Sequence, residues 1–337
     1  MTVLSSPPSA RPSRRDLIAL LAALSASGIA FPSYAQAQSA FKPTRPVKII
    51  NPLLAGGATD AIVRPIALRL GELWGQPVVV ENRAGGGTII GTQVVAQAPP
   101  DGHTIGVAIS ALTINPSLRS DLPYDTFKDI TPITQIGRIT SVLVAHPSFP
   151  ANNMRELIAE AKAKPGTISW ASLGVGTAGH ITGELLRKRA GIDIVHVPFA
   201  GSSAAYRELL PGRIPVGFVV LESALPHIKA GKLKALAITD PQRNRLHPQI
   251  PLLGEAMPGL GYEGVFGFIG PGGLPPEILR AINTDIVKVL AEPEVRKRLE
   301  EQSMDMVASS PSEFSAVVRR EVENWKKAVK ESGADVK

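Results

Sequence analysis

Short hydrophobic runs alternate with segments of helical periodicity along most of the chain. The run at 47–50 (VKII) precedes a helical pattern at 58–75, and the run at 77–80 (PVVV) precedes another at 88–98. Further runs of strand character are HTIGVAI, SVLVAHP, ISWA, IDIVHVP, VGFVV, LKALAIT and VFGFIG. Strands that alternate with helices predict an α/β protein whose parallel or mixed sheets are flanked by helices.

The C-terminal segment has a different pattern, because it is almost purely helical from Pro275 onward. The residues Ser310 to Glu313 (SPSE) form a capping box with proline at the first helical position. They predict the start of a last helix that continues through Lys330.

Length and composition refine this picture. The chain has 337 residues, 44% hydrophobic and 19% charged, which is long for one domain and favours two lobes. It has no cysteine, which excludes disulfides, thiolate zinc sites and cysteine nucleophiles.

The N-terminus has the pattern of a cleaved export signal over residues 1–37. Three arginines precede the apolar stretch from Leu17 to Phe31, and small residues in an A-x-A pattern end at Ala37. The apolar stretch is shorter than the roughly 20 residues of a membrane span. The pair Arg14 and Arg15 leaves the Sec and twin-arginine routes equally open. Both routes predict a bacterial periplasmic protein.

The net charge says less about which molecules the protein binds. The formal net charge of the chain is +7, and residues 1–37 hold three arginines and one aspartate, a net +2, which leaves +5 for the remainder. Aromatic residues are only 5% of the chain and do not interleave with basic blocks, so nucleic acid is not expected as a partner. The basic balance fits either an anionic small molecule or an ordinary solvated surface.

The segment SLGVGTAGH at 172–180 lies between a predicted strand and a predicted helix. Its glycine spacing matches the G-x-G-x-x-G dinucleotide fingerprint, but that site needs an acidic residue about 20 positions later, where Phe199 stands. The unpaired amides at the start of the helix instead suit an anion. A tight turn that satisfies backbone geometry alone remains an equal alternative.

A second loop of the same kind favours the anion site. The segment NPLLAGGATD at 51–60 also joins a strand to a helix, with Gly56 and Gly57 just before the helix. Ligands of open α/β sheets bind at such loops. A carboxylate at Asp60 would repel an anionic ligand, so we expect Asp60 to cap the helix or tie the loop amides.

Enzyme and metal signatures are missing. The histidines include no pair at helical metal spacing, and there is no H-E-x-x-H or G-x-S-x-G motif. We predict no catalytic residue, no metal site and no cofactor. His180 is interpreted as a hydrogen-bond donor or packing group, since it has no positioned partner for base catalysis.

Several motifs in this order resemble the substrate-binding proteins of tripartite tricarboxylate transporters, the Bug family. They cover the chain from Phe41 to its end and are AGGATD, GQPVVVENRAGGGTIIG, PPDGHTI, INPSL, LPYDTFKDI, HVPFAGSSAA, SALPHIKAGKLKALAIT and PEVRKRL. The resemblance implies a two-lobed periplasmic binding protein of type II-like fold, with two sheets joined by two crossing strands. Lobe 1 would comprise 41–137 plus 263–337, and lobe 2 would comprise 138–262.

The resemblance also implies function and site. A small carboxylate would bind between the lobes and be delivered to the membrane permease subunits, with a monomer as the default state. A ligand-loaded sensor for a two-component system is the alternative, and a periplasmic enzyme is less favoured. The ligand-binding residues would be Ala55, Gly56, Gly57, Ala58, Thr59, Asp60, Ser172, Gly176, Thr177, Ala178, Gly179 and His180, with Phe199, Gly201 and Ser202 from the HVPFAGSS segment.

The chain departs from the family pattern before Gly56. Leu53 and Leu54 stand where relatives commonly have an aromatic residue, so we expect a carboxylate ligand with an apolar or aromatic body in preference to an amino acid. Glu222 stands where proline is usual, and the roles of Glu222 and of the loop Gly85 to Gly87 stay open. We also expect Gly179→Asp to abolish binding while the fold stays intact.

Overall fold

The computed structural model describes residues 41–56, 58–199, 201–301 and 304–334. The predicted export signal, with its cleavage site near Ala37, lies outside the described residues. Within the described part, no helix combines the length and apolar character that a membrane span requires.

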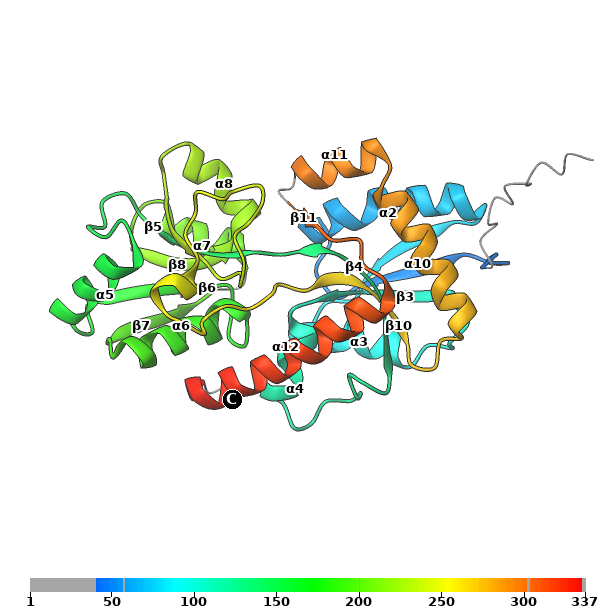
Figure 1. The fold of residues 1–337 in the computed structure, drawn as a ribbon, viewed down its shortest axis with the longest axis horizontal. Helices are drawn as coiled ribbons and strands as arrows, with labels where there is room; N and C mark the ends of the chain where they lie inside the picture. Colours follow the sequence, from blue (N-terminus) through cyan, green and yellow to red (C-terminus); the bar gives the residue numbers. More distant parts are fainter. Residues whose placement is uncertain (1–40, 57, 200, 302–303, 335–337) are drawn as a thin grey trace, which may run out of the picture. The chain divides into compact units, whose positions relative to one another are not determined.

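Six strands form sheet A in the order β11-β4-β10-β3-β1-β2 (Figure 1). Strands β1, β2 and β3 are parallel, and β10 runs antiparallel to both β3 and β4. The strands are β1 (Val47–Asn51), β2 (Val78–Asn82), β3 (Thr104–Ile109), β4 (Ile130–Arg138), β10 (Phe266–Pro271) and β11 (Asp305–Met306). The associated helices are α2 (Ala58–Trp74), the 3-10 turn η1 (Gly86–Thr88), α3 (Ile89–Ala96), α4 (Ala111–Leu118), α10 (Pro276–Leu290) and α11 (Pro293–Glu301).

Five strands form sheet B in the order β7-β6-β8-β5-β9. Strand β6 is parallel to β7 and β8, while β5 is antiparallel to β8 and β9. The strands are β5 (Ser141–Ala145), β6 (Ile168–Ser172), β7 (Ile194–Pro198), β8 (Val216–Val220) and β9 (Lys234–Ile238). The helices are α5 (Met154–Ala163), α6 (Ala178–Ala190), α7 (Ser202–Leu209), α8 (Leu221–Lys229) and α9 (Leu253–Ala256).

The predicted α/β class with two mixed sheets flanked by helices is confirmed. The predicted capping box is also present, because the Ser310 side chain accepts from the Glu313 amide and Glu313 bonds back to the Ser310 amide. It opens α12 (Pro311–Ser332), which continues two residues past Lys330 and ends at Gly333 in a left-handed conformation. The segment after Pro275 is less purely helical than expected, since it also contains β11.

Two connections join the sheets, at 139–140 between β4 and β5 and at 239–265 between β9 and β10. Phe266, where the second connection enters sheet A, pairs with Ile109 at the carboxyl end of β3. In sheet B, the first residue of β5 pairs with Val220 at the carboxyl end of β8. The carboxyl ends of the parallel strands in both sheets therefore lie on the sides where the chain crosses. The lobe boundaries expected after residues 137 and 262 remain a proposal.

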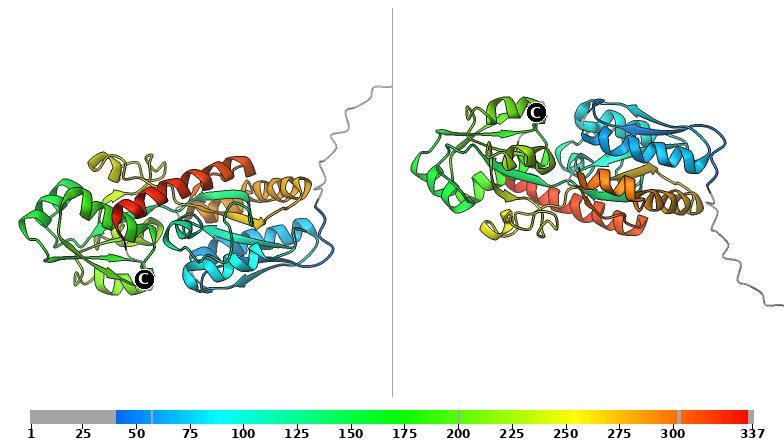
Figure 2. Two further views of the ribbon diagram at one scale, coloured as in Figure 1. Left: turned by 90° about the horizontal axis from the view of Figure 1, so that it is seen from below. Right: turned by 90° about the horizontal axis from the view of Figure 1, so that it is seen from above.

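Helix α12 contacts elements of both sheets (Figures 1 and 2, red). It packs on α4 and β4 beside sheet A and on α6 beside sheet B. Trp325 stacks on Tyr262 of the second connection, with ring centroids 4.1 Å apart. Near the helix end, Glu331 accepts from the Arg189 guanidinium of α6 at 2.6 Å. The last helix therefore holds elements of both sheets.

Candidate functional site

Asp60 organises the loop between β1 and α2. Its carboxylate accepts from the Gly56 amide at 2.8 Å and from the Asn51 side chain at 2.7 Å. The Asn82 amide group at the end of β2 and the Arg64 guanidinium donate to the same carboxylate, at 3.0 Å and 3.1 Å. Both carboxylate oxygens are thus occupied, and the structure agrees with the interpretation that Asp60 ties the loop.

These contacts also determine the protonation state of Asp60. Burial alone would raise its pKa, but the donors from Asn82, Gly56, Arg64 and Asn51 outweigh it and lower the pKa to about 2. The group is therefore an ionised part of the loop scaffold. Of the other residues predicted in this loop, Thr59 is buried and Ala55 is exposed. Gly57 and the side chain of Ala58 lie outside the described part.

The loop between β6 and α6 is held by its own side chains. The Ser172 hydroxyl accepts from the Gly174 amide at 3.2 Å, and the Thr177 hydroxyl donates to the Gly174 carbonyl at 2.7 Å. Thr177 is also the N-cap of α6, since its hydroxyl accepts from the His180 amide. The Gly176 amide donates to Nδ1 of His180 at 3.1 Å. The side chains of Ser172, Thr177 and His180 are therefore engaged within the protein.

Two amides at the start of α6 are left for an external acceptor. Among the described residues, no acceptor contacts the amides of Ala178 and Gly179. Such amides carry the positive end of the helix dipole and attract anions. Ala178 also borders a small cavity of about 10 Å³, which is lined by Ser110, Ser141, Thr182, Thr239 and Trp325 among others.

The third predicted segment lies beside this loop, because β7 pairs in parallel with β6. The Phe199 amide donates to the Ser172 carbonyl at 3.0 Å, and the Gly201 amide donates to the Phe199 carbonyl at 2.9 Å. Gly201 has a φ of 92° and precedes Ser202, the first residue of α7. The structure thus brings the segment at 172–180 together with Phe199, Gly201 and Ser202 at the carboxyl ends of β6 and β7.

The loop Gly85 to Gly87 lies beside the first candidate loop. A Cβ on Gly91, in the helix that follows, would lie 2.8 Å from Pro52 and from the Arg83 carbonyl. The Gly87 carbonyl accepts from the Asn115 side chain of α4 at 3.0 Å. The segment that contains this loop and the start of α3 therefore lies between the loop that follows β1 and helix α4.

Glycines of α6 set how closely this helix approaches sheet B. A Cβ on Gly179 would lie 2.7 Å from the Cβ of Phe218 on β8. The expectation that Gly179→Asp leaves the fold intact is therefore wrong, because any side chain at this position overlaps a buried strand. One turn later, a Cβ on Gly183 would lie 2.2 Å from the ring of Trp170 on β6.

We expect Gly183→Ala to lower the free energy of unfolding by about 1–3 kcal/mol, because overpacking forces the helix away from the buried indole. Urea denaturation measures this loss. Gly254→Ala in α9 is the control, because a Cβ there makes only ordinary contact, 3.6 Å from the Leu260 carbonyl, and should leave stability nearly unchanged. Equal stability of Gly183→Ala and the wild type would contradict the close contact.

Three titratable side chains meet beneath the second loop. Each of His180, Glu184 and His196 offers one ligand-type atom, and these atoms lie within 4.8 Å of one another. The rings of His180 and His196 stack at 4.4 Å with an interplanar angle of 20°, and His196 stacks on Trp170 at 4.3 Å. Sequence spacing missed this cluster because His196 comes from β7, and only its position in the adjacent strand brings it to α6.

Burial favours the neutral form of both histidines. Burial lowers the pKa of His180, although Glu184 opposes the shift. Burial and the neighbouring His180 lower the pKa of His196 to about 4, again against Glu184. His196 Nε2 lies 2.7 Å from the Ser172 hydroxyl. The cluster is therefore linked to both ends of the loop, through Ser172 and through Gly176.

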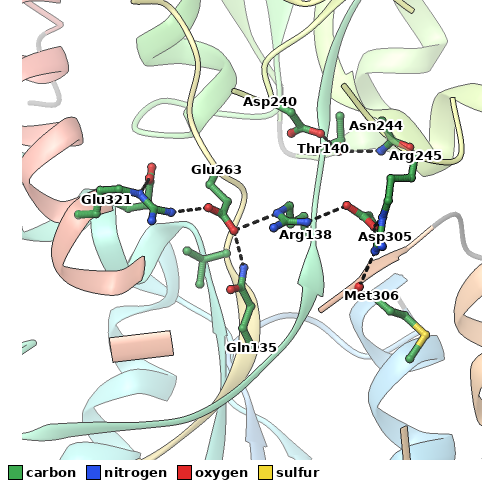
Figure 3. Close-up of polar contacts among 12 residues, drawn as sticks. Gln135, Arg138, Thr140, Asp240, Asn244, Arg245, Glu263, Asp305, Met306 and Glu321 are labelled. Atoms are coloured by element: carbon green, nitrogen blue, oxygen red, sulfur yellow. Dashed lines mark hydrogen bonds and ion pairs between the residues drawn. The ribbon is translucent and has the colours of Figure 1, made fainter. Parts of the chain in front are cut away.

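A charged network joins the two connections (Figure 3). Arg138 at the end of β4 donates to Glu263 at 3.0 Å and to Asp305 of β11 at 2.9 Å. Arg245 of the second connection donates to Asp305 at 2.7 Å, and Thr140 donates to Asp240 at 2.6 Å. The surrounding cavity measures about 420 Å³, and none of the described residues predicted to bind ligand lines it. The cationic side chains of this cavity are paired with carboxylates. Arg138 pairs with Glu263, Arg243 with Glu255 and Arg245 with Asp305.

Glu222 lies at the start of α8, beside the first connection. Its Oε2 is shielded from solvent and has no hydrogen-bond partner among the described residues. Burial raises its pKa to about 8, the neighbouring Asp240 adds to the shift, and the backbone amides of Glu222 and Thr140 oppose it. Glu222 as a whole is half-buried, and its carboxyl oxygen Oε2 is shielded from solvent beside the crossing strands.

Comparisons with known proteins identify the family. Residues 62–334 match the model of the tripartite tricarboxylate transporter family receptor. The solved periplasmic binding protein BugD is 29% identical, with a TM-score of 0.75, and the match covers 87% of this chain and 99% of BugD.

Two further solved relatives hold carboxylates. An R. palustris protein solved with adipate is 30% identical, with a TM-score of 0.78, and the match covers 87% of this chain and 99% of that one. MatC from Rhodopseudomonas palustris, solved with bound malate, is 28% identical, with a TM-score of 0.74, and the match covers 85% and 99%. The predicted family and its two-lobed fold are confirmed: the chain belongs to the tripartite tricarboxylate transporter receptor family of periplasmic solute-binding proteins.

Proposed function

We propose that this protein captures a small carboxylate between the loops that follow β1 and β6 and delivers it to the permease subunits of a tripartite transporter. The observation that carries the proposal is the pair of unpartnered amides of Ala178 and Gly179 at the start of α6. Related proteins solved with adipate and malate support a carboxylate as the ligand class. The protein works in the periplasm as a monomer after cleavage near Ala37, and it releases its ligand unchanged.

The position of the two loops supports capture from both sides. Each loop follows the carboxyl end of a parallel strand, on the side of its sheet where the chain crosses to the other sheet. A carboxylate bound to one loop thus lies toward the other half. Residues Gly56 to Asp60 contribute the first loop, and Gly176 to His180 the second.

The loop side chains indicate which carboxylate fits. Leu54 is 79% exposed on the first loop and Val175 is 50% exposed on the second, so both can cover an apolar ligand body. Asp60 has no free oxygen for a ligand ammonium group, since its four donors come from the protein. A carboxylic acid with an apolar chain therefore fits better than an amino acid.

Thermal unfolding of the chain from Gln38 onward, stripped of ligand, tests the proposal. The panel contains adipate, longer and aromatic carboxylates, malate, aspartate and the uncharged adipamide. A ligand at about 1,000 times its dissociation constant stabilises the protein by roughly 4 kcal/mol, which raises the melting temperature clearly. We expect an apolar carboxylate to raise it and adipamide not to. Equal shifts with adipate and adipamide contradict the anion site, and a preference for aspartate contradicts the ligand class.

A further inference from the structure

The amides of the second loop differ in whether the protein already provides them with a hydrogen-bond acceptor. The amides of Gly174 and Gly176 are consumed inside the protein, by the Ser172 hydroxyl and by Nδ1 of His180. The His180 amide is consumed by the Thr177 cap. In the first turn of α6, the amides of Ala178 and Gly179 have no acceptor among the described residues, and the Val175 amide earlier in the loop likewise has none.

The His180 ring is also held on its face. It stacks on His196, which stacks in turn on the buried Trp170 of β6, so three rings lie in a row beneath the loop. His196 Nε2 contacts the Ser172 hydroxyl at 2.7 Å, which links the same stack to the start of the loop. The stack therefore links the loop, at Ser172 and at Gly176, to β6 and β7.

A metal ion is the other possible use of this cluster, and the geometry argues against it. Nδ1 of His180 accepts from the Gly176 amide, so the neutral ring carries its proton on Nε2 and has no lone pair to offer there. The two rings also lie nearly parallel, 20° apart, and the lone pairs of stacked imidazoles do not converge on one ion. Metal binding requires that the ring abandon the Gly176 amide.

We propose that His180 is a positioning residue for the carboxylate site, which fixes the loop by accepting the Gly176 amide at Nδ1 and so leaves the amides of Ala178 and Gly179 to the ligand. This inference rests on the proposed function, because the ligand is taken to bind at those amides. Only the neutral ring can serve. A proton on Nδ1 turns the acceptor into a donor that faces another N–H, so the contact with Gly176 breaks.

Two charged or titratable groups face the ring. Glu184 lies one turn later on α6, and His196 faces the ring from β7. Burial lowers the pKa of His180 and keeps the ring neutral, while Glu184 favours the protonated ring. Affinity for the carboxylate should therefore be steady at neutral pH and fall as the solution becomes acidic enough to protonate His180.

Two variants distinguish the role of Nδ1 of His180 as a hydrogen-bond acceptor from the space that the ring fills. In His180→Asn, Oδ1 takes the place of Nδ1 and still accepts from Gly176, whereas His180→Leu keeps the bulk without an acceptor. Calorimetric titration with adipate at pH 7.5 should show about a 10-fold or greater loss for His180→Leu, because the loop amide loses its buried partner. His180→Asn should stay within a few-fold of wild type and should lack the decline in affinity on acidification. Equal affinity of wild type and His180→Leu overturns the proposal, as does an acid decline that His180→Asn retains.

A ligand-free measurement separates this inference from the proposed function. Nitrogen-15 NMR of the His180 ring should show the proton on Nε2, with the Gly176 amide protected from hydrogen exchange in wild type and His180→Asn but not in His180→Leu. A proton on Nδ1 overturns the positioning role even where carboxylates bind. If no carboxylate binds the wild type, the proposed function fails while this NMR result still decides the Gly176 contact. A rise in melting temperature with Zn²⁺ that His180→Asn abolishes assigns the cluster to a metal and overturns the proposal.

Discussion

Asp60→Ala is expected to abolish carboxylate binding and to lower the free energy of unfolding by roughly 3–5 kcal/mol. The change removes the one acceptor shared by the Gly56 amide and by the side chains of Asn51, Asn82 and Arg64. Each buried donor left without a partner costs about 1–3 kcal/mol, and the loop loses the contact that sets its shape. Urea denaturation and titration with adipate, below the melting temperature of the variant, measure the two effects.

The control for this variant is Asp121→Ala, since Asp121 is exposed. A surface change of this kind alters stability by no more than about 0.5 kcal/mol and should leave binding unchanged. Wild-type affinity in folded Asp60→Ala is the result that contradicts the role of the first loop. The wild type itself should also lose stability in strong acid, as Asp60 takes up a proton below its ordinary pKa of 3.8 and toward its folded value of about 2.

Glu222→Gln is expected to stabilise the protein only as the pH rises. The pKa of Glu222 is raised from 4.5 to about 8 in the folded protein, so its neutral form is favoured by folding. That contribution is fully present below pH 4.5 and is lost as the pH rises through about 8. Glutamine is neutral throughout, so the variant should resemble wild type at pH 4.5 and be more stable than wild type at pH 9, by roughly 3–5 kcal/mol at most.

Chemical denaturation of both proteins between pH 4.5 and 9 gives the difference curve. Asp240 beside Glu222 also titrates, with its pKa raised to about 6, so the informative quantity is the difference between the two proteins and not either slope alone. The exposed Glu323 on α12 supplies the control, and Glu323→Gln should follow the wild-type curve. A difference that is constant with pH contradicts a buried, neutral Glu222.

Local patterns predicted much of this fold, because they depend on neighbours along the chain. The capping box at Ser310 needs only four consecutive residues, and the alternation of strands and helices needs only hydrophobic periodicity. The tie made by Asp60 was also predictable, since a carboxylate beside an anion-binding loop must have donors of its own. The two glycine loops were visible for the same local reason.

Contacts between distant elements were not predictable in this way. His196 contacts His180 because β7 lies next to β6. A side chain at Gly179 would overlap Phe218, which comes from β8 and is distant in the sequence. Arg138 and Asp305 are 167 residues apart, and neither has a local pattern that indicates the other. These pairings follow from strand order, which the helix and strand pattern leaves undetermined.

The order of strands has a consequence for how the chain folds as it is made. All five strands of sheet B come from one continuous stretch, 141–238, so that sheet can assemble as soon as Ile238 has emerged. Sheet A cannot, because β10 (Phe266–Pro271) lies between β4 and β3 in its interior. Until β10 arrives, β3 and β4 keep unpaired edges, which are the segments most exposed to misassembly. Sheet A, which contains the first strands of the chain, is therefore completed last. Its strands β3 and β4 can pair with β10 only after the synthesis of residues that lie more than 120 positions later.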